Sequence, residues 1–178
     1  LLAEEGIVAS FGITGEWAEQ NPALVRRMVD EGHMLINHTY DHSSWTGASP
    51  GTAPLSERER LAQLERTEAV VEEIAGYELR PYFRFTYGDY DEAALELLKE
   101  AGYDYALFWT CDTMAWMDRP PEEIVAWCAP EDPERGGPGA VILMHVAQEA
   151  DWEALPGLID AYRDAGYAFV TMEQLVQP

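Results

Sequence analysis

Basic side chains are scarce in this chain. Its 178 residues include 33 acidic side chains against 11 lysines and arginines, Lys99 is the one lysine, and the formal net charge is −22 at pH 7. A surface so rich in carboxylates repels nucleic-acid phosphates and anionic membranes. Neither is therefore expected as a partner.

Long apolar runs and cysteine clusters are also missing. No stretch approaches the roughly 18 apolar residues of a membrane span, and no basic-then-apolar leader is present. Cys111 and Cys128 have neither the spacing of a zinc finger nor the density of a disulfide scaffold, which leaves the redox compartment open. The chain opens at Leu1 in what resembles the last turn of a helix, so we expect the true start to lie upstream.

Several catalytic fingerprints are absent as well. The sequence has no G-x-S-x-G elbow, no phosphate-binding loop and no dinucleotide fingerprint. It does place three of its four histidines in "GHMLINHTYDH", residues 32–42. Metal-assisted hydrolysis is therefore the chemistry that the sequence favours.

One junction recurs along the chain: an amphipathic helical stretch, a glycine, then a short apolar strand. Glycine suits the end of a helix because it adopts the left-handed conformation at little cost. Helices that alternate with strands predict an α/β fold with parallel strands. The glycines at these junctions are Gly6, Gly32, Gly76, Gly102 and Gly166.

Helix starts agree with this reading. Pro22 follows Asn21 at a first turn, Ser56 and Glu59 have the spacing of a capping box, and Asp91 precedes "EAALELLKE". The helix predicted from Ser56 has a charged face and a buried apolar stripe, which consists of Leu61, Leu64, Val71 and Ile74.

Polar and aromatic residues gather where at least four of the predicted strands end. A β/α barrel builds its active site at the carboxyl ends of its strands, whereas an open sheet focuses such groups at one switch point. We therefore expect a single domain, residues 1–178, with an irregular barrel. The residues at these ends are His38, His42, Arg84, Asp112, Trp116 and His145.

The H-x-x-x-H pair is the sharpest candidate site. His38 and His42 lie on one side of a helical turn, where both imidazoles can reach one ion, and catalytic zinc takes three protein ligands and a water. Thr39 occupies the glutamate position of H-E-x-x-H, which excludes that metalloprotease motif. The alternative is that both histidines cap a helix or bond to backbone carbonyls.

The other candidates also have structural interpretations. His145 ends an apolar strand, where a histidine is more often a satisfied core residue. Arg84, between two phenylalanines, requires a carboxylate if it is buried, and a structural ion pair would provide one. Trp116 and Tyr87 fit simple core packing, and His33 is interpreted as structural.

Four ordered motifs together resemble the polysaccharide deacetylases, carbohydrate esterase family 4 with a NodB-like catalytic domain. They are the segment ending in "NHTYDH", the arginine motif "YFRFTYGDYD", the motif "CDTMAW" and the final "ILMHV". The resemblance runs nearly end to end. It implies a distorted (β/α)7–8 barrel, here truncated at the N-terminus so that the first strand is absent.

The resemblance also implies a metal site. His38 and His42 would be two ligands of a divalent metal, usually zinc, with cobalt, manganese or nickel also used, and the Thr39 hydroxyl would brace the loop. The family's third ligand and its catalytic base are neighbouring aspartates in a "TFDDG" stretch on the first strand. This chain has neither, so we expect them to lie upstream of Leu1.

The implied reaction is hydrolysis of an acetyl group on a glycan. A metal-bound water would attack the carbonyl, with the Tyr87 backbone N–H holding the oxyanion and His145 as general acid. Leu143 would line the pocket for the acetyl methyl group and Trp116 would wall the groove. Arg84 would pair with the upstream base and hold it in place.

Two departures from the family pattern stand out. Phe85 and Thr86 replace common prolines, which is expected to loosen the loop. Ala115 replaces an aspartate that tunes the catalytic histidine in many members, so His145 is expected to be a poorer acid unless Asp112 substitutes.

Three functional interpretations follow. The first is a metal-dependent deacetylase of N-acetylglucosamine-containing glycans, such as peptidoglycan or chitin oligomers, or of acetylxylan. The others are a non-catalytic barrel that binds metal or glycan, and a hydrolase of small cyclic amides or ureides. A glycan substrate implies action outside the cytoplasm. The unpaired strand edges left by a missing first strand favour self-association as a homo-oligomer.

Overall fold

The computed structural model describes residues 1–176 and divides the chain into two compact units. Unit 1 consists of Leu1–Leu107 with the C-terminal stretch from Val170, and unit 2 consists of Phe108–Phe169. That residues 1–178 form a single domain stays a prediction.

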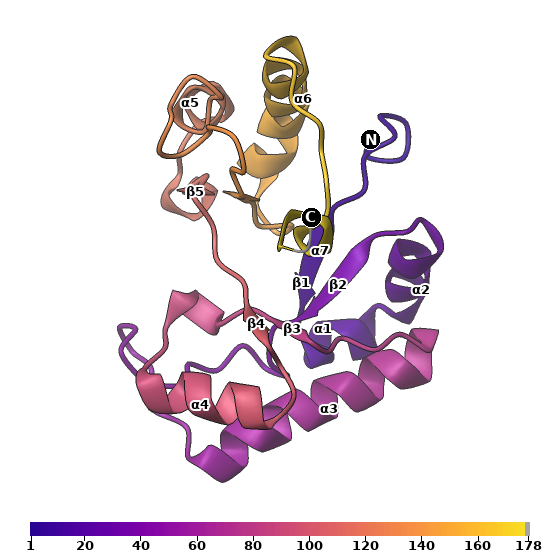
Figure 1. Ribbon diagram of the computed structural model, residues 1–178, viewed down its shortest axis with the longest axis vertical. Coiled ribbons are helices and arrows are strands. Elements are labelled where there is room, and N and C mark those ends of the chain that lie inside the picture. Colours follow the sequence, from indigo (N-terminus) through magenta and orange to yellow (C-terminus); the bar gives the residue numbers. More distant parts are fainter. Residues whose placement is uncertain (177–178) are drawn as a thin grey trace. The chain divides into compact units, whose positions relative to one another are not determined.

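Unit 1 is built on a parallel sheet with helices around it (Figure 1). The sheet has the order β1-β2-β3-β4, and Ser10 pairs with Met34 while Tyr82 pairs with Tyr105. The strands are β1 (Ser10–Ile13), β2 (Met34–Asn37), β3 (Tyr82–Phe83) and β4 (Tyr105–Ala106). The helices are α1 (Gly15–Gln20), α2 (Pro22–Asp30), α3 (Glu57–Ala75), α4 (Glu92–Glu100) and α7 (Met172–Val176), with a 3₁₀ turn η1 (Thr86–Gly88).

The predicted helix boundaries are confirmed. Ser56 and Glu59 form a capping box at the start of α3, and the Asp91 side chain accepts the Ala94 N–H at the start of α4. The N-cap of α2 is Asn21, although its side chain makes no cap bond there. All five junction glycines have φ between +62° and +86°.

The apolar stripe of α3 packs under the sheet. Leu64 and Val71 are fully buried, and Leu61 and Ile74 lie partly buried against the same cores. The buried face of α3 also contains two polar residues, Thr67 and Glu68. The predicted stripe consisted of apolar residues alone and did not include them. Glu68 is four residues after Leu64 and three before Val71, and this helical spacing turns it inward.

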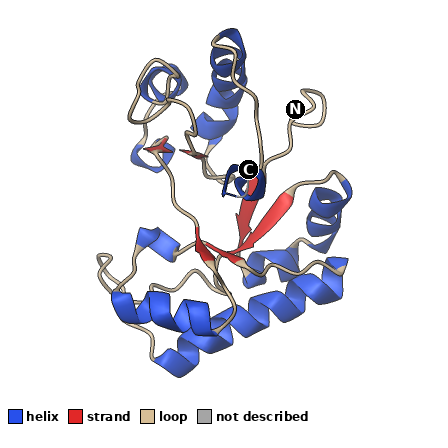
Figure 2. Ribbon diagram, in the orientation of Figure 1, coloured by secondary structure: helices blue, strands red, loops and turns tan. Residues whose placement is uncertain are grey.

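Unit 2 has a short parallel pair of strands covered by two helices (Figure 2). Cys111 pairs with Ile142 and Asp112 with Leu143. A disulfide joins Cys111 to Cys128. The elements are β5 (Cys111–Asp112), η2 (Ala115–Met117), α5 (Pro121–Trp127), β6 (Ile142–Leu143) and α6 (Glu149–Asp164).

The strands are shorter than the sequence predicted. The expected strand at "YAFVTM" has no strand backbone in residues 167–171, and "AVILMH" gives a strand of only Ile142–Leu143. The α/β class with parallel strands is confirmed. The described strands form a four-stranded and a two-stranded sheet, and no closed barrel is detected among residues 1–176. Within the same residues, no helix combines the length and the apolar character needed to cross a bilayer.

Candidate active site

The histidine pair lies in a tight turn that leaves the carboxyl end of β2. Asn37 is the last residue of β2, and the chain then takes left-handed backbone at Thr39 (φ 68°) and at His42 (φ 63°). The Thr39 hydroxyl accepts the His42 N–H at 3.1 Å. This contact fixes the second histidine relative to the first.

The two imidazoles adjoin each other. Their ring centroids are 4.9 Å apart with an interplanar angle of 83°. His38 Nδ1 lies 2.8 Å from the Arg84 carbonyl oxygen, which can only accept, so the neutral ring carries its proton on Nδ1 and its lone pair on Nε2. A backbone carbonyl in this position is typical of metal-ligating histidines. The donor chemistry of His38 therefore suits a metal ion.

A buried polar chain holds this turn from beneath. Asn37 Oδ1 accepts the Thr39 N–H at 3.1 Å, and Asn37 Nδ2 donates to the Tyr103 hydroxyl at 2.6 Å. Tyr103 in turn donates to Glu68 Oε1 at 2.7 Å. Burial, and then the bond to Glu68, raise the pKa of Tyr103, so its hydroxyl stays a donor. Asn37 and Tyr103 are at most 1% exposed.

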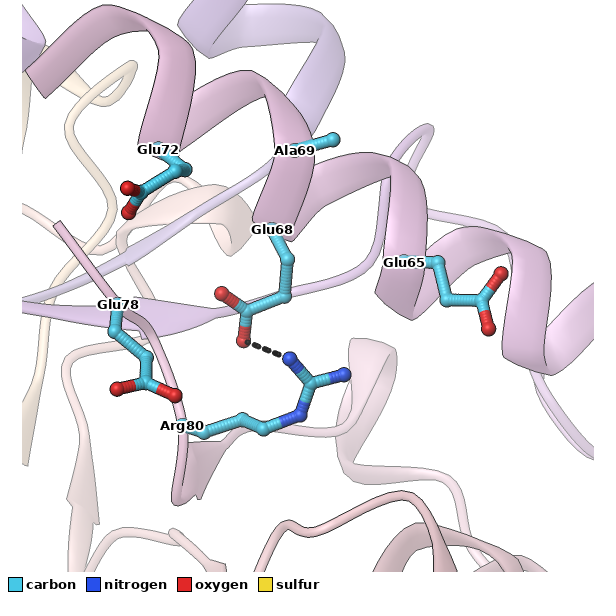
Figure 3. Close-up of a pocket in the computed structure, with 6 residues that line it drawn as sticks. All are labelled: Glu65, Glu68, Ala69, Glu72, Glu78 and Arg80. Atoms are coloured by element: carbon cyan, nitrogen blue, oxygen red, sulfur yellow. Dashed lines mark ion pairs between the residues drawn. The ribbon is translucent and has the colours of Figure 1, made fainter. Parts of the chain in front are cut away.

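Glu68, the last residue of this hydrogen-bonded series, lines an acidic pocket (Figure 3). Arg80 reaches across the pocket to Glu68, with Nη1 at 3.6 Å from Oε1. The pocket has a volume of about 510 Å³, and its lining residues are Glu65, Glu68, Ala69, Glu72, Glu78 and Arg80. None of the predicted site residues lines it.

The arginine motif is tied to the histidine turn. Arg84 follows β3, and its N–H donates to the Asn37 carbonyl at 3.0 Å. The His38 and Arg84 side chains both lie against Gly12 of β1. A Cβ atom added to Gly12 would lie 3.7 Å from the His38 side chain and 3.8 Å from Arg84 Cδ. The carboxyl ends of β1, β2 and β3 therefore bring His38 and Arg84 together, as the parallel-strand argument predicted.

That Phe85 and Thr86, in place of the family prolines, loosen this loop stays a prediction. The Thr86 hydroxyl donates to the Ser43 carbonyl at 2.7 Å, so it links the arginine motif to the histidine turn. Phe85 is fully buried against Trp45. Threonine at position 86 supplies a hydrogen bond, whereas proline would supply only a fixed φ.

Asp89 clamps the next part of the same loop. Its buried carboxylate accepts hydrogen bonds from the Ser44 and Thr46 hydroxyls. Burial alone would raise the pKa of Asp89, but the hydroxyl bonds, together with hydrogen bonds from the backbone of residues 48 and 49, outweigh it and hold the pKa below its ordinary value. Tyr87 is 53% exposed with left-handed backbone, and its ring lies 4.8 Å from the His42 ring.

The remaining predicted site residues lie in unit 2. Asp112 Oδ1 accepts the Met114 N–H at 2.9 Å, and its Oδ2 accepts the Trp116 indole N–H at 3.3 Å. Trp116 is 53% exposed, so core packing does not explain it. Leu143 is buried at the end of β6. His145 lies two residues after β6 rather than inside the strand, with a side chain that is 36% exposed.

The position of Ala115 and the grouping of possible metal ligands complete the description of the site. Ala115 is buried in a core that also contains Ala154 of α6, so this position holds packing rather than charge. Among residues 1–176, no group of three or more His, Cys, Asp and Glu side chains is arranged to hold a metal ion.

The chain is similar to known deacetylases in sequence and in fold. Residues 1–106 match the family model described as polysaccharide deacetylase. The peptidoglycan-N-acetylglucosamine deacetylase of Bacillus cereus is 29% identical over 180 residues, which cover 99% of this chain and 61% of that protein. The T48 deacetylase, solved with substrate, is 30% identical with a TM-score of 0.83, covering 98% of this chain and 79% of the other.

A further solved structure is similar in fold alone. It is a CE4-family pseudoenzyme from Bacillus anthracis, 24% identical with a TM-score of 0.83, and the match covers 99% of this chain and 58% of the other. The chain spans about three fifths of the length of the curated relatives that it matches first, 63%, 61% and 64% of them.

Proposed function

Because this chain belongs to the polysaccharide deacetylase family, we propose that it takes part in metal-dependent hydrolysis of acetyl groups on a glycan that contains N-acetylglucosamine. The observation that carries the proposal is the His38–His42 pair at the carboxyl end of β2, with His38 oriented by the Arg84 carbonyl.

His38 and His42 are the proposed ligands of a divalent metal, most simply zinc. Two adjoining imidazoles, one of them with its proton held on Nδ1, are the donors that zinc accepts, and cobalt, manganese and nickel bind the same donors. A catalytic zinc site takes three protein ligands, so a further ligand from outside residues 1–176 is part of the proposal. When bound, the metal would supply Lewis acidity for water and the carbonyl group.

Other residues of the chain would orient and protonate the substrate. The Tyr87 backbone N–H is proposed as an oxyanion donor, because its ring adjoins that of His42. His145 is proposed to hold the proton that the departing amine takes. Leu143 would contact the acetyl methyl group, and the exposed Trp116 ring would stack on a sugar. Arg84 would pair with a carboxylate base.

The names of the relatives support peptidoglycan as the first substrate to test. A peptidoglycan substrate places the reaction outside the cytoplasm, and the Cys111–Cys128 disulfide fits an oxidising compartment. Self-association stays a prediction.

Metal binding can be tested without any assay of activity. The full chain is titrated with Zn²⁺ or Co²⁺ in a calorimeter, and the metal content of the dialysed protein is measured. We expect His38→Ala or His42→Ala to weaken metal binding at least tenfold, because each removes a ligand. The control is His33→Gln, at the opposite end of β2, where the imidazole accepts the Ala9 N–H. Equal binding by all four proteins would overturn the metal site.

Acetate release then tests the reaction. The metal-loaded full-length protein is offered peptidoglycan, chitin oligomers, acetylxylan and a set of cyclic amides and ureides. Release from a glycan supports the proposal. Metal or glycan binding without release indicates a non-catalytic module, and turnover of cyclic amides alone indicates a different hydrolase.

A further inference from the structure

His145 has a carboxylate neighbour that its sequence position did not reveal. Asp151 lies in the first turn of α6, six residues after His145. Its Oδ2 accepts the His145 backbone N–H at 2.6 Å and lies 4.0 Å from His145 Nδ1. One carboxylate therefore contacts both the backbone and the imidazole of the same residue.

Burial makes this carboxylate unusual in unit 2. Asp151 is 3% exposed, and its Oδ1 is buried with no hydrogen-bond partner among the described residues. A buried carboxylate is costly unless a positive charge or hydrogen-bond donors compensate for the lost water. The amino-terminal end of α6 supplies part of this compensation through its backbone dipoles. A protonated His145 imidazole would supply the rest.

Other acidic side chains near α6 and β6 do not take this role. Asp112 is engaged by Met114 and Trp116. The remaining carboxylates on the elements packed against α6, and on α6 close to Asp151, are all exposed: Asp118, Glu122, Glu123, Glu149 and Glu153. Asp151 is the one buried acidic residue of unit 2 within the described chain.

We propose that Asp151 is the anionic partner of the His145 imidazole and acts as a positioning residue. Its carboxylate holds the backbone at His145 and stabilises the imidazolium form of the ring. The catalytic consequence rests on the proposed function, in which His145 delivers a proton. The contact between the two side chains does not depend on it.

Two substitutions separate the charge from the backbone contact. Asp151→Asn keeps an oxygen that can accept the His145 N–H but removes the negative charge, whereas Asp151→Ala removes both. The matched control is Asp160→Asn, which removes an exposed carboxylate from the same helix. All three are made in the full chain and first checked for a folded circular dichroism spectrum.

A double-mutant cycle tests the contact without any assay of activity. Urea unfolding is measured for wild type, Asp151→Asn, His145→Phe and the double variant. Each variant changes the unfolding equilibrium constant by some factor. We expect the factor for the double variant to differ by about threefold or more from the product of the factors for the two single variants, and this ratio is the coupling factor. A coupling factor of one would overturn the proposal, because an Asp151 that holds only the backbone N–H is indifferent to the ring at His145.

Kinetics test the consequence. If the metal-loaded wild type releases acetate, Asp151→Asn is expected to lower kcat about tenfold or more with KM unchanged, because general acid catalysis depends on the protonated ring. Asp160→Asn is expected to match wild type. An unchanged kcat in Asp151→Asn would overturn the catalytic role. An inactive wild type with a coupled cycle would count against the proposed function and leave the side-chain contact supported.

Discussion

At the scale of single residues, Tyr103 occupies the centre of the support under the histidine turn. Its hydroxyl accepts from Asn37 and donates to Glu68, and both neighbours are buried. Asn37 then holds the Thr39 N–H, two residues from the strand end. The hydrogen bonds at the histidine turn thus extend to a side chain 66 positions away from Asn37.

We predict that Tyr103→Phe lowers the free energy of unfolding by about 1–3 kcal/mol, because two buried polar groups, on Asn37 and Glu68, each lose one hydrogen bond. The same change should also weaken Zn²⁺ binding, because Asn37, which accepts the Thr39 N–H in the histidine turn, loses its bond to Tyr103. Urea unfolding and zinc titration measure the two effects. The control is Tyr105→Phe, whose hydroxyl makes no hydrogen bond within residues 1–176. If Tyr103→Phe has the stability and the zinc affinity of wild type, the hydrogen bonds from Asn37 through Tyr103 to Glu68 do not support the histidine turn.

At the scale of elements, short loops carry the site and regular elements position them. The Asp89 carboxylate connects η1 to residues 44–46 through the Ser44 and Thr46 hydroxyls, and Thr86 adds its bond to Ser43. The arginine motif and the histidine turn are therefore joined by buried and partly buried hydrogen bonds within unit 1.

We predict that the contribution of Asp89 to stability depends on pH. The pKa of Asp89 in the folded state lies below its ordinary value of 3.8, so the stabilisation is present above that pH and is lost as the pH falls through the lower folded value. Asp89→Asn should cost about 1–3 kcal/mol at pH 7 and progressively less in acid. Unfolding at several pH values checks this, with the exposed Asp104→Asn as control. A cost that stays constant down to pH 2 would contradict the assignment.

The sequence was informative about elements whose signals are local. The glycines at helix ends, the Ser56 capping box and the order of strands and helices depend on neighbouring residues, and the structure confirms them. The roles of Glu68 and Asp151 depend on which elements pack together, and a single sequence does not contain that information. The one local signal for Glu68 was its place inside the apolar stripe of α3.

Strand length was the least predictable feature. Apolar runs such as "YDYALFW" predict strands, but only Tyr105–Ala106 pair there. Backbone pairing requires a neighbouring strand in register, whereas an apolar side chain can be buried without one. The roles of the site residues in metal binding and catalysis stay predictions.

At the scale of the whole chain, the disulfide restrains unit 2 alone. It joins β5 to the end of α5 across a separation of 17 residues, and both cysteines are fully buried in the core of that unit. Its effect on stability should be confined to Phe108–Phe169.

We predict that the double variant Cys111→Ala, Cys128→Ala loses about 3 kcal/mol of stability, as expected for a closed loop of this length. Hydrogen exchange followed by mass spectrometry should show faster exchange in residues 108–169 and unchanged exchange in β1 and β2. Adding a reductant to wild type should reproduce the effect, and adding it to the variant should do nothing. Faster exchange in unit 1 would contradict this assignment.

The left-handed residues Thr39, His42 and Tyr87 have a consequence for protein engineering. Each non-glycine residue in that conformation costs roughly 1–2 kcal/mol. The roles proposed for Thr39 and His42 belong to their side chains, whereas the role proposed for Tyr87 belongs to its backbone N–H. A selection for heat resistance alone would therefore enrich glycine and asparagine at all three positions. The selected variants would have higher thermal stability but would lack these residues of the proposed site. Thermostabilised versions of this chain are best sought with these three positions held fixed.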